Sequence, residues 1–176
     1  MLENPLEELE KLNLAGEKAK ILERIVVPLY SFKKGEKTVF PKSGLNIWNA
    51  AGRKRNTDEV YIPFPAEIRT TFENFFPNRK TPFNVQLPDG KIISMKVSQD
   101  NGKALTSNPN RVLGKWILRD ILNIPYNKLL TYDMLLAIGI DAVVFEKIDG
   151  TYRLDFVEVG GYEDFLYNYV LSDVDV

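Results

Sequence analysis

The stretch PFNVQLPDGKIISMKV, residues 82–97, decides the fold class of this chain. Apolar and polar residues alternate on both sides of Pro88-Asp89-Gly90. Alternation with a period of two is typical of a strand that buries one face, and Pro-Asp-Gly is typical of a tight turn. The stretch therefore predicts a β-hairpin.

A second stretch, DAVVFEKIDGTYRLDFV at residues 141–157, predicts another hairpin around an Asp-Gly turn. IVVPLYSF (25–32) and EVYIPF (59–64) are further strand candidates, and Pro28 suggests an edge or a bulge in the first. Six or seven short, mostly antiparallel strands favour a barrel or a sandwich. The sequence predicts a mainly β fold with short helices.

Three short helices are predicted between the strands. Pro65 opens the first and Asn108-Pro109 the second, whereas Thr131 caps the third and Gly139 ends it. The second helix is expected to expose Arg111, Lys115 and Arg119 on one face. The chain therefore divides into an N-terminal helix or linker (1–24), a β domain (25–160) and an acidic C-terminal tail (161–176).

Residue usage excludes several kinds of site. The chain of 176 residues holds no cysteine and no histidine, which excludes disulfides, thiolate zinc sites and histidine-based catalysis, including that of phospholipase D-type nucleases. Its N-terminus is acidic, and no apolar run approaches the roughly 18 residues that span a bilayer. We expect a cytoplasmic protein without a membrane segment, bound metal or cofactor.

Charge is segregated along the chain although the net charge is only −1. Residues 33–56 hold seven basic residues against one acid, a net of +6, and residues 79–119 hold eight against two, again +6. Residues 131–176 hold ten acids against two basic residues, a net of −8. Such a chain can present one basic face to a polyanion, although scattered solvated charge is the alternative.

Two long polar connections carry the candidate binding groups. GLNIWNAAGRKRN (44–56) combines Trp48, three asparagines and Arg-Lys-Arg, and SQDNGKALTSNPNR (98–111) is rich in amides and basic residues. Loops of this length tend to be functional or disordered. Arginine pairs with guanine edges and asparagine or glutamine with adenine edges in the major groove, while lysine suits phosphates. The pair of connections favours major-groove reading, and a basic loop with Trp48 in the core stays open as the alternative.

A self-contained metal-dependent nuclease is the main competing hypothesis. Pro88-Asp89 is followed by Ser94-Met95-Lys96, but Ser94 stands where such nucleases carry an acid. The acids at 155, 158, 163 and 164 match no defined cation-binding loop. A protein-interaction module that uses Trp48 as an anchor is a third hypothesis.

Four segments resemble a known family, namely 43–69, 75–105, 113–125 and 141–156. They are similar, in order over about residues 26–157, to the C-terminal DNA-recognition domain of NgoFVII-type restriction endonucleases. That domain resembles the EcoRII N-terminal and plant B-three domains. The resemblance implies a seven-stranded pseudobarrel that grips double-stranded DNA between two arms, joined in longer proteins to a phospholipase D-like nuclease that this chain lacks.

The resemblance places one arm at residues 43–56 and the other at 99–111. We call them the first arm and the second arm. The DNA-contacting candidates on them are Ser43, Asn46, Trp48, Asn49, Arg53, Lys54, Arg55, Asn56, Gln99, Asp100, Asn101, Lys103, Ser107, Asn110 and Arg111. The expected phosphate contacts are Lys42, Arg79, Lys80 and Lys115. The expected function is sequence-specific recognition for a restriction endonuclease, with no catalysis in this chain and a phospholipase D-like nuclease domain or subunit as partner.

Overall fold

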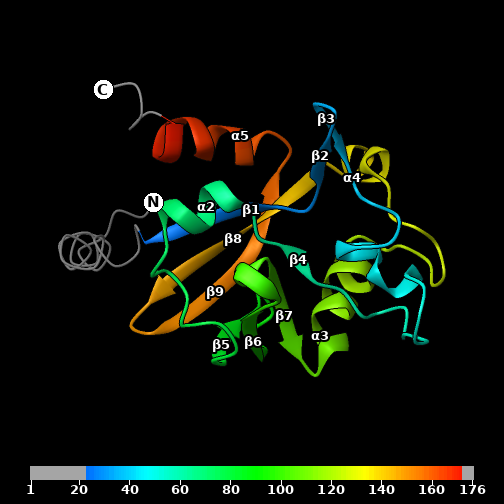
Figure 1. The fold of residues 1–176 in the computed structure, drawn as a ribbon, viewed down its shortest axis with the longest axis horizontal. Coiled ribbons are helices and arrows are strands. Elements are labelled where there is room, and N and C mark those ends of the chain that lie inside the picture. Colours follow the sequence, from blue (N-terminus) through cyan, green and yellow to red (C-terminus); the bar gives the residue numbers. More distant parts are fainter. Residues whose placement is uncertain (1–22, 172–176) are drawn as a thin grey trace, which may run out of the picture.

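A seven-stranded sheet, closed almost into a barrel, forms the body of the protein. The structure, a computed structural model, describes residues 23–171. The strand order is β1-β8-β9-β5-β6-β7-β4, and the edge strands β1 and β4 contact each other. Their bounds are Arg24–Pro28 (β1), Ile62–Pro63 (β4), Phe83–Gln86 (β5), Ile92–Ser98 (β6), Ala104–Asn108 (β7), Ile140–Ile148 (β8) and Thr151–Glu158 (β9). The predicted mainly β pseudobarrel with short helices is confirmed (Figure 1).

Both predicted hairpins are present. β5 pairs antiparallel with β6, with Val85 opposite Ile93, and β8 pairs antiparallel with β9, with Phe145 opposite Leu154. Among the strands of residues 23–171, only β5 and β9 pair in parallel, and this pairing joins the two hairpins into one sheet. The strand predicted at 59–64 is shorter, since β4 holds only two residues.

The helices cover the ends of the barrel. They are α2 (Ala66–Thr71), α3 (Asn110–Gly114), α4 (Tyr132–Ile138) and α5 (Gly161–Leu166), with α3 continuing as the π-helix η3 (Lys115–Ile121) and α5 as η4 (Tyr167–Leu171). Thr131 caps α4 as predicted, because its Oγ1 accepts from the Met134 N–H at 3.3 Å, and Gly139 ends it at φ 92°. The predicted cap Asn108 instead ends β7, and the Ser107 hydroxyl accepts from the Leu113 N–H at 3.0 Å.

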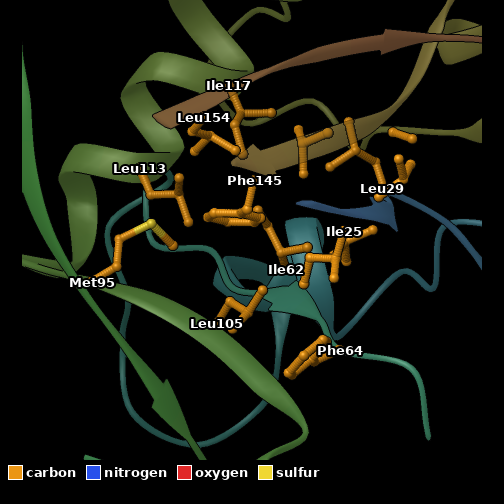
Figure 2. Packing of buried hydrophobic residues seen from close by; sticks show 14 of the residues in the cluster. Ile25, Leu29, Ile62, Phe64, Met95, Leu105, Leu113, Ile117, Phe145 and Leu154 are labelled. Atoms are coloured by element: carbon orange, nitrogen blue, oxygen red, sulfur yellow. The ribbon is translucent and has the colours of Figure 1, made fainter. Parts of the chain in front are cut away.

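One continuous core fills the barrel (Figure 2). Ile25, Phe145 and Leu105 come from three different strands and are fully buried. Burying a side chain of this size contributes roughly 1.5–3 kcal/mol relative to leaving it exposed. The core therefore gives the loops that leave the strands a rigid base.

Residues 161–171, the described part of the predicted tail, belong to this domain. Tyr162, Phe165 and Val170 are buried in the core, and Tyr162 Oη donates to Glu67 Oε1 at 3.0 Å. Buried positions three to five residues apart form a stripe on one face of a short helix, with Glu163 and Asp164 exposed beside it. The predicted boundary at 160 is thus replaced by a domain that continues to at least residue 171. Residues 1–22 of the predicted N-terminal helix or linker (1–24) lie outside the described residues. Its last residue, Arg24, is the first residue of β1.

Candidate nucleic-acid interface

The first arm begins with a short 3₁₀ helix, η1 (Gly44–Asn49), in which Asn46 has a structural role. Asn46 is 1% exposed, and its Nδ2 donates to the carbonyls of Phe40 at 3.0 Å and Leu130 at 2.9 Å. Its Oδ1 accepts from the Leu130 N–H at 2.9 Å. Because these bonds are buried within the fold, we leave Asn46 out of the proposed DNA contacts.

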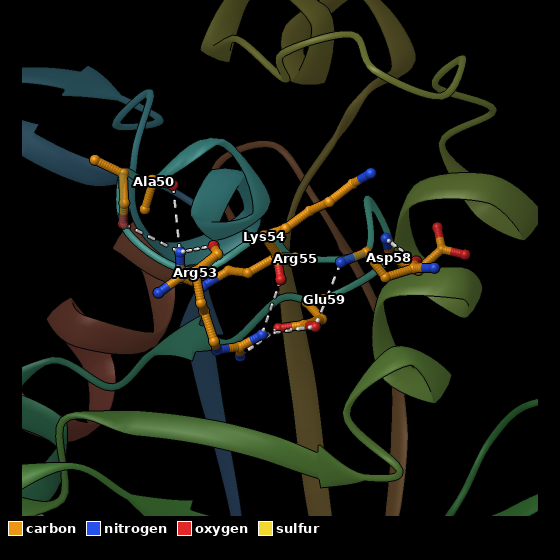
Figure 3. A network of polar contacts seen from close by, with 8 residues as sticks. Ala50, Arg53, Lys54, Arg55, Asp58 and Glu59 are labelled. Atoms are coloured by element: carbon orange, nitrogen blue, oxygen red, sulfur yellow. Dashed lines mark hydrogen bonds and ion pairs between the residues drawn. The ribbon is translucent and has the colours of Figure 1, made fainter.

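The tip of the first arm is folded by its own polar groups (Figure 3). The Arg53 guanidinium meets Glu59 at 2.8 and 3.3 Å, and this hydrogen bond lowers the pKa of the Glu59 carboxyl. Arg55 Nη1 donates to the carbonyls of Ala50, Ala51 and Arg53 at 3.3–3.4 Å. Asn56 Oδ1 accepts from the Asp58 N–H at 2.8 Å. The arginines therefore shape the loop, while Lys54 is exposed and Arg53 stays 60% exposed beside its ion pair.

Other first-arm candidates lie closer to the body. Ser43 and Trp48 are half-buried, and Asn49 Nδ2 donates to the Pro41 carbonyl at 3.0 Å. Lys42, expected to contact phosphate, is exposed at the start of the arm. The exposed side chains are therefore Lys42, just before the first arm, and those of residues 51–54 and 56 at its tip.

The first arm returns to the barrel through a largely buried ion pair. Arg119 Nε donates to Asp58 Oδ1 at 2.7 Å, and Nη2 donates to the Thr57 carbonyl at 2.8 Å. The side chains of Arg119 and Asp58 are 10% and 13% exposed. Arg119 was expected on the exposed helical face with Arg111 and Lys115, but the return of the chain at Asp58 buries it.

The second arm is a tight turn at η2 (Asp100–Gly102), and two arginines hold its backbone. Asn101 has φ 61° and ψ 15°, a left-handed conformation that asparagine tolerates better than most residues, and Gln99 also has a positive φ of 68°. Arg79 Nη1 donates to the Gln99 carbonyl at 3.0 Å, and Arg69 Nη1 donates to the Asn101 carbonyl at 2.7 Å. This clamp leaves the side chains of Gln99, Asp100 and Asn101 exposed, with that of Asp100 fully so and 3.5 Å from Arg79.

Ser107 in β7 is buried and used within the fold. Its Oγ donates to the Pro109 carbonyl at 2.8 Å and accepts from the Leu113 N–H at 3.0 Å. We therefore leave Ser107, like Asn46, out of the proposed DNA contacts. Asn110 and Arg111 are exposed at the start of α3.

The remaining phosphate candidates are exposed but are not equivalent. Lys80 is exposed with φ 71°, and Lys115 lies 3.7 Å from Asp120 on the same helix. Arg79 is 44% exposed while it also supports the second arm. Arg79 therefore has a structural role, and its contact with phosphate stays a prediction.

The two arms flank the same short strand. Phe64, just after β4, donates its N–H to the Lys103 carbonyl of the second arm at 2.8 Å. Tyr61, just before β4, donates its N–H to the Gly44 carbonyl of the first arm at 3.3 Å. β4 therefore lies between the two arms and fixes their separation.

A third element at this surface was missed from the sequence. β2 (Ser31–Lys33) and β3 (Glu36–Thr38) form a separate two-stranded hairpin, whose turn residues Lys34 and Gly35 have φ of 53° and 81°. A Lys-Lys-Gly turn between β-prone residues was the available signal. A cavity of about 320 Å³ places the hairpin beside the second arm, since its lining includes Ser31, Phe32, Pro63, Arg69 and Lys103.

Polar groups at the base of this hairpin anchor it to the barrel. Lys37 pairs with Glu163 and lies 5.0 Å from the centre of the Tyr30 ring. Tyr132 Oη donates to Asp141 Oδ2 at 2.6 Å, and Asp141 is completely buried. The hairpin base is thus fixed while its tip is exposed.

Asp141 is expected to make stability depend on pH. Burial raises the pKa of its carboxyl group, so its contribution to folding is greatest below the unfolded value of about 3.9 and falls as the pH rises toward the folded value. We expect the stability of Asp141→Asn relative to the parent to increase between about pH 3 and pH 7. Urea unfolding of both proteins at several pH values measures this change. A difference in unfolding free energy that does not vary with pH would contradict a raised pKa of Asp141.

Two properties of the described part of the chain concern function directly. Within residues 23–171, no group of three or more acidic side chains is placed to hold a metal ion. In the same range, the structure has no helix of the length and apolar character that a bilayer crossing requires.

Comparison with known proteins identifies the family. Among the curated proteins compared, none matches this chain. The model of the NgoFVII C-terminal B3-like DNA-binding domain matches residues 22–149, which is most of the chain and includes both arms and the β2–β3 hairpin. The chain therefore belongs to the NgoFVII C-terminal B3-like DNA-binding domain family.

Proposed function

We propose that this DNA-binding domain recognises a specific double-stranded sequence through the major groove with its two arms. It supplies target recognition to a restriction endonuclease and performs no catalysis itself. A nuclease domain or subunit of the phospholipase D-like type is the proposed partner, and the cytoplasm the proposed location.

The second arm is the observation that carries the proposal. Its backbone is held by Arg69 and Arg79, while Gln99, Asp100 and Asn101 are exposed. Amide side chains on a fixed backbone lose little freedom on binding and can meet base edges in a defined register. Lys54, Lys80, Lys103 and Arg111 are exposed cations suited to the surrounding phosphates.

Selection of bound duplexes from a random library, followed by sequencing, tests specific recognition. An enriched motif is the expected result. A bound pool with no enriched motif would reduce the function to general DNA binding. Incubation of plasmid with the protein and Mg²⁺ is expected to leave the plasmid uncut.

Asn101→Gly is expected to weaken binding to the selected duplex by about 5- to 150-fold, since a good amide–base pair contributes on the order of 1–3 kcal/mol of discrimination. Glycine accepts the positive φ of this position, so the change removes the side chain without straining the turn. Binding to a scrambled duplex should change little. Titrations of both duplexes measure the effect.

Asn123→Gly is the matched control. Asn123 is also exposed with positive φ, 53°, but lies outside both arms. The Asn123→Gly variant should bind both duplexes with the same affinity as the parent protein. If Asn101→Gly lost the same amount of affinity for the selected and the scrambled duplex, Asn101 would not be reading a base.

A further inference from the structure

The β2–β3 hairpin carries an exposed aromatic ring at the edge of the proposed interface. Phe32 is 53% exposed, and its ring lies edge-on to that of Tyr30 with centroids 5.6 Å apart. Its cross-strand partner is Lys37, which is held at the hairpin base by Glu163. The ring is therefore held on one side while the other is open to solvent.

The surroundings of Phe32 combine apolar side chains with charged ones. The lining of the cavity of about 320 Å³ includes Pro28, Pro63 and Pro65, together with Glu67, Arg69 and, from the second arm, Lys103. Lys33 and Lys34 are exposed at the tip of the hairpin. An apolar surface with four cations beside it, Lys33, Lys34, Arg69 and Lys103, fits a polyanion that also presents an apolar group.

Duplex DNA has such a group in its major groove. The C5-methyl group of thymine, or of 5-methylcytosine, points into a groove about 12 Å wide, which admits a two-stranded β-ribbon. Phenylalanine is among the side chains that contact this methyl group. A hairpin of two three-residue strands with a two-residue turn has the dimensions of such a ribbon.

We propose that the β2–β3 hairpin enters the major groove beside the second arm, and that Phe32 contacts a pyrimidine C5-methyl group there. The inference rests on the proposed function and adds a specificity determinant to it. Lys33 and Lys34 then lie against phosphates on the groove wall. The predicted preference is for a methylated over an unmethylated pyrimidine at one position of the site.

Base replacement in the selected duplex tests this contact. Each thymine is replaced singly by uracil, which removes only the methyl group, and each cytosine singly by 5-methylcytosine, which adds one. At one position the methylated base should bind the parent protein about fourfold more tightly, the value of one buried methyl group. If replacing a thymine by uracil weakens binding, the contacted methyl group is that of thymine. If replacing a cytosine by 5-methylcytosine strengthens binding, the contacted methyl group is that of 5-methylcytosine.

Phe32→Ala should abolish that difference, and Phe32→Leu should keep part of it. Tyr167→Ala, which removes an aromatic ring 71% exposed on η4, is the control and should leave it intact. The proposal is overturned if no methyl group matters to the parent, or if Phe32→Ala weakens methylated and unmethylated duplexes equally. Failure to bind any duplex would instead overturn the proposed function.

Discussion

Gly114→Ala is expected to lower the free energy of unfolding by about 3 kcal/mol, since overpacking typically costs about 1–3 kcal/mol and backbone that cannot move puts this site at the upper end. A Cβ at position 114 would lie 1.8 Å from the Asp58 carbonyl oxygen and 2.7 Å from its carbonyl carbon. Alanine is otherwise favoured over glycine inside a helix by about 1 kcal/mol. A loss therefore reports the close approach of the first arm to α3 and not helix propensity.

Urea unfolding followed by tryptophan fluorescence measures the effect, because Trp116 is buried and stacked on Phe156. Lys115→Ala, at the next and exposed position of the same helix, should change stability by less than about 0.5 kcal/mol. If Gly114→Ala were as stable as the parent, the return of the first arm at Asp58 would not be fixed against the helix.

Arg119→Met is expected to cost about 3 kcal/mol of stability, since removing one partner of a buried ion pair leaves the other charge uncompensated. Asp58, which is 13% exposed in the parent, would lose its cation, and the carbonyls of Thr57 and Ile124 would lose donors at 2.8 and 2.7 Å. Methionine keeps most of the apolar volume, so the loss reflects the polar contacts.

A double-mutant cycle with Asp58→Asn separates the ion pair from the carbonyl bonds. We expect the two changes to be clearly less than additive, and additive losses would contradict the pairing. Arg119→Met also tests the link between the stability of the first arm and DNA recognition. Loosening the first arm should reduce the preference for the selected duplex more than it reduces binding to scrambled DNA.

The exposed and buried members of the arms could not be told apart from sequence. Asn46 and Arg119 were predicted to be exposed with their neighbours, yet Asn46 bonds to Leu130, 84 residues along the chain, and Arg119 to Asp58, 61 residues back. Local composition carries no information about such partners. The second arm was predicted more fully, because Asp-Asn-Gly adopts its turn from local preferences.

Segment boundaries show the same limit. The acidic composition of residues 161–176 suggested a solvated tail, although Tyr162, Phe165 and Val170 lie on the buried side of a helix. Their burial depends on the apolar face that β1 presents, which the local sequence of the helix does not specify. The β2–β3 hairpin was likewise missed, because the predicted strand at 25–32 covered only its first residues.

The sequence by itself determined the two large hairpins, the capped helix at 132–138 and the family. These features follow from side-chain alternation, turn residues and motif order, which act over a few neighbouring residues. Only the tertiary structure decided which arm side chains are free to meet DNA and that Phe32 lies beside Lys103. The reason is that burial and hydrogen-bond partners are set by residues distant in the chain, which meet only when the barrel closes.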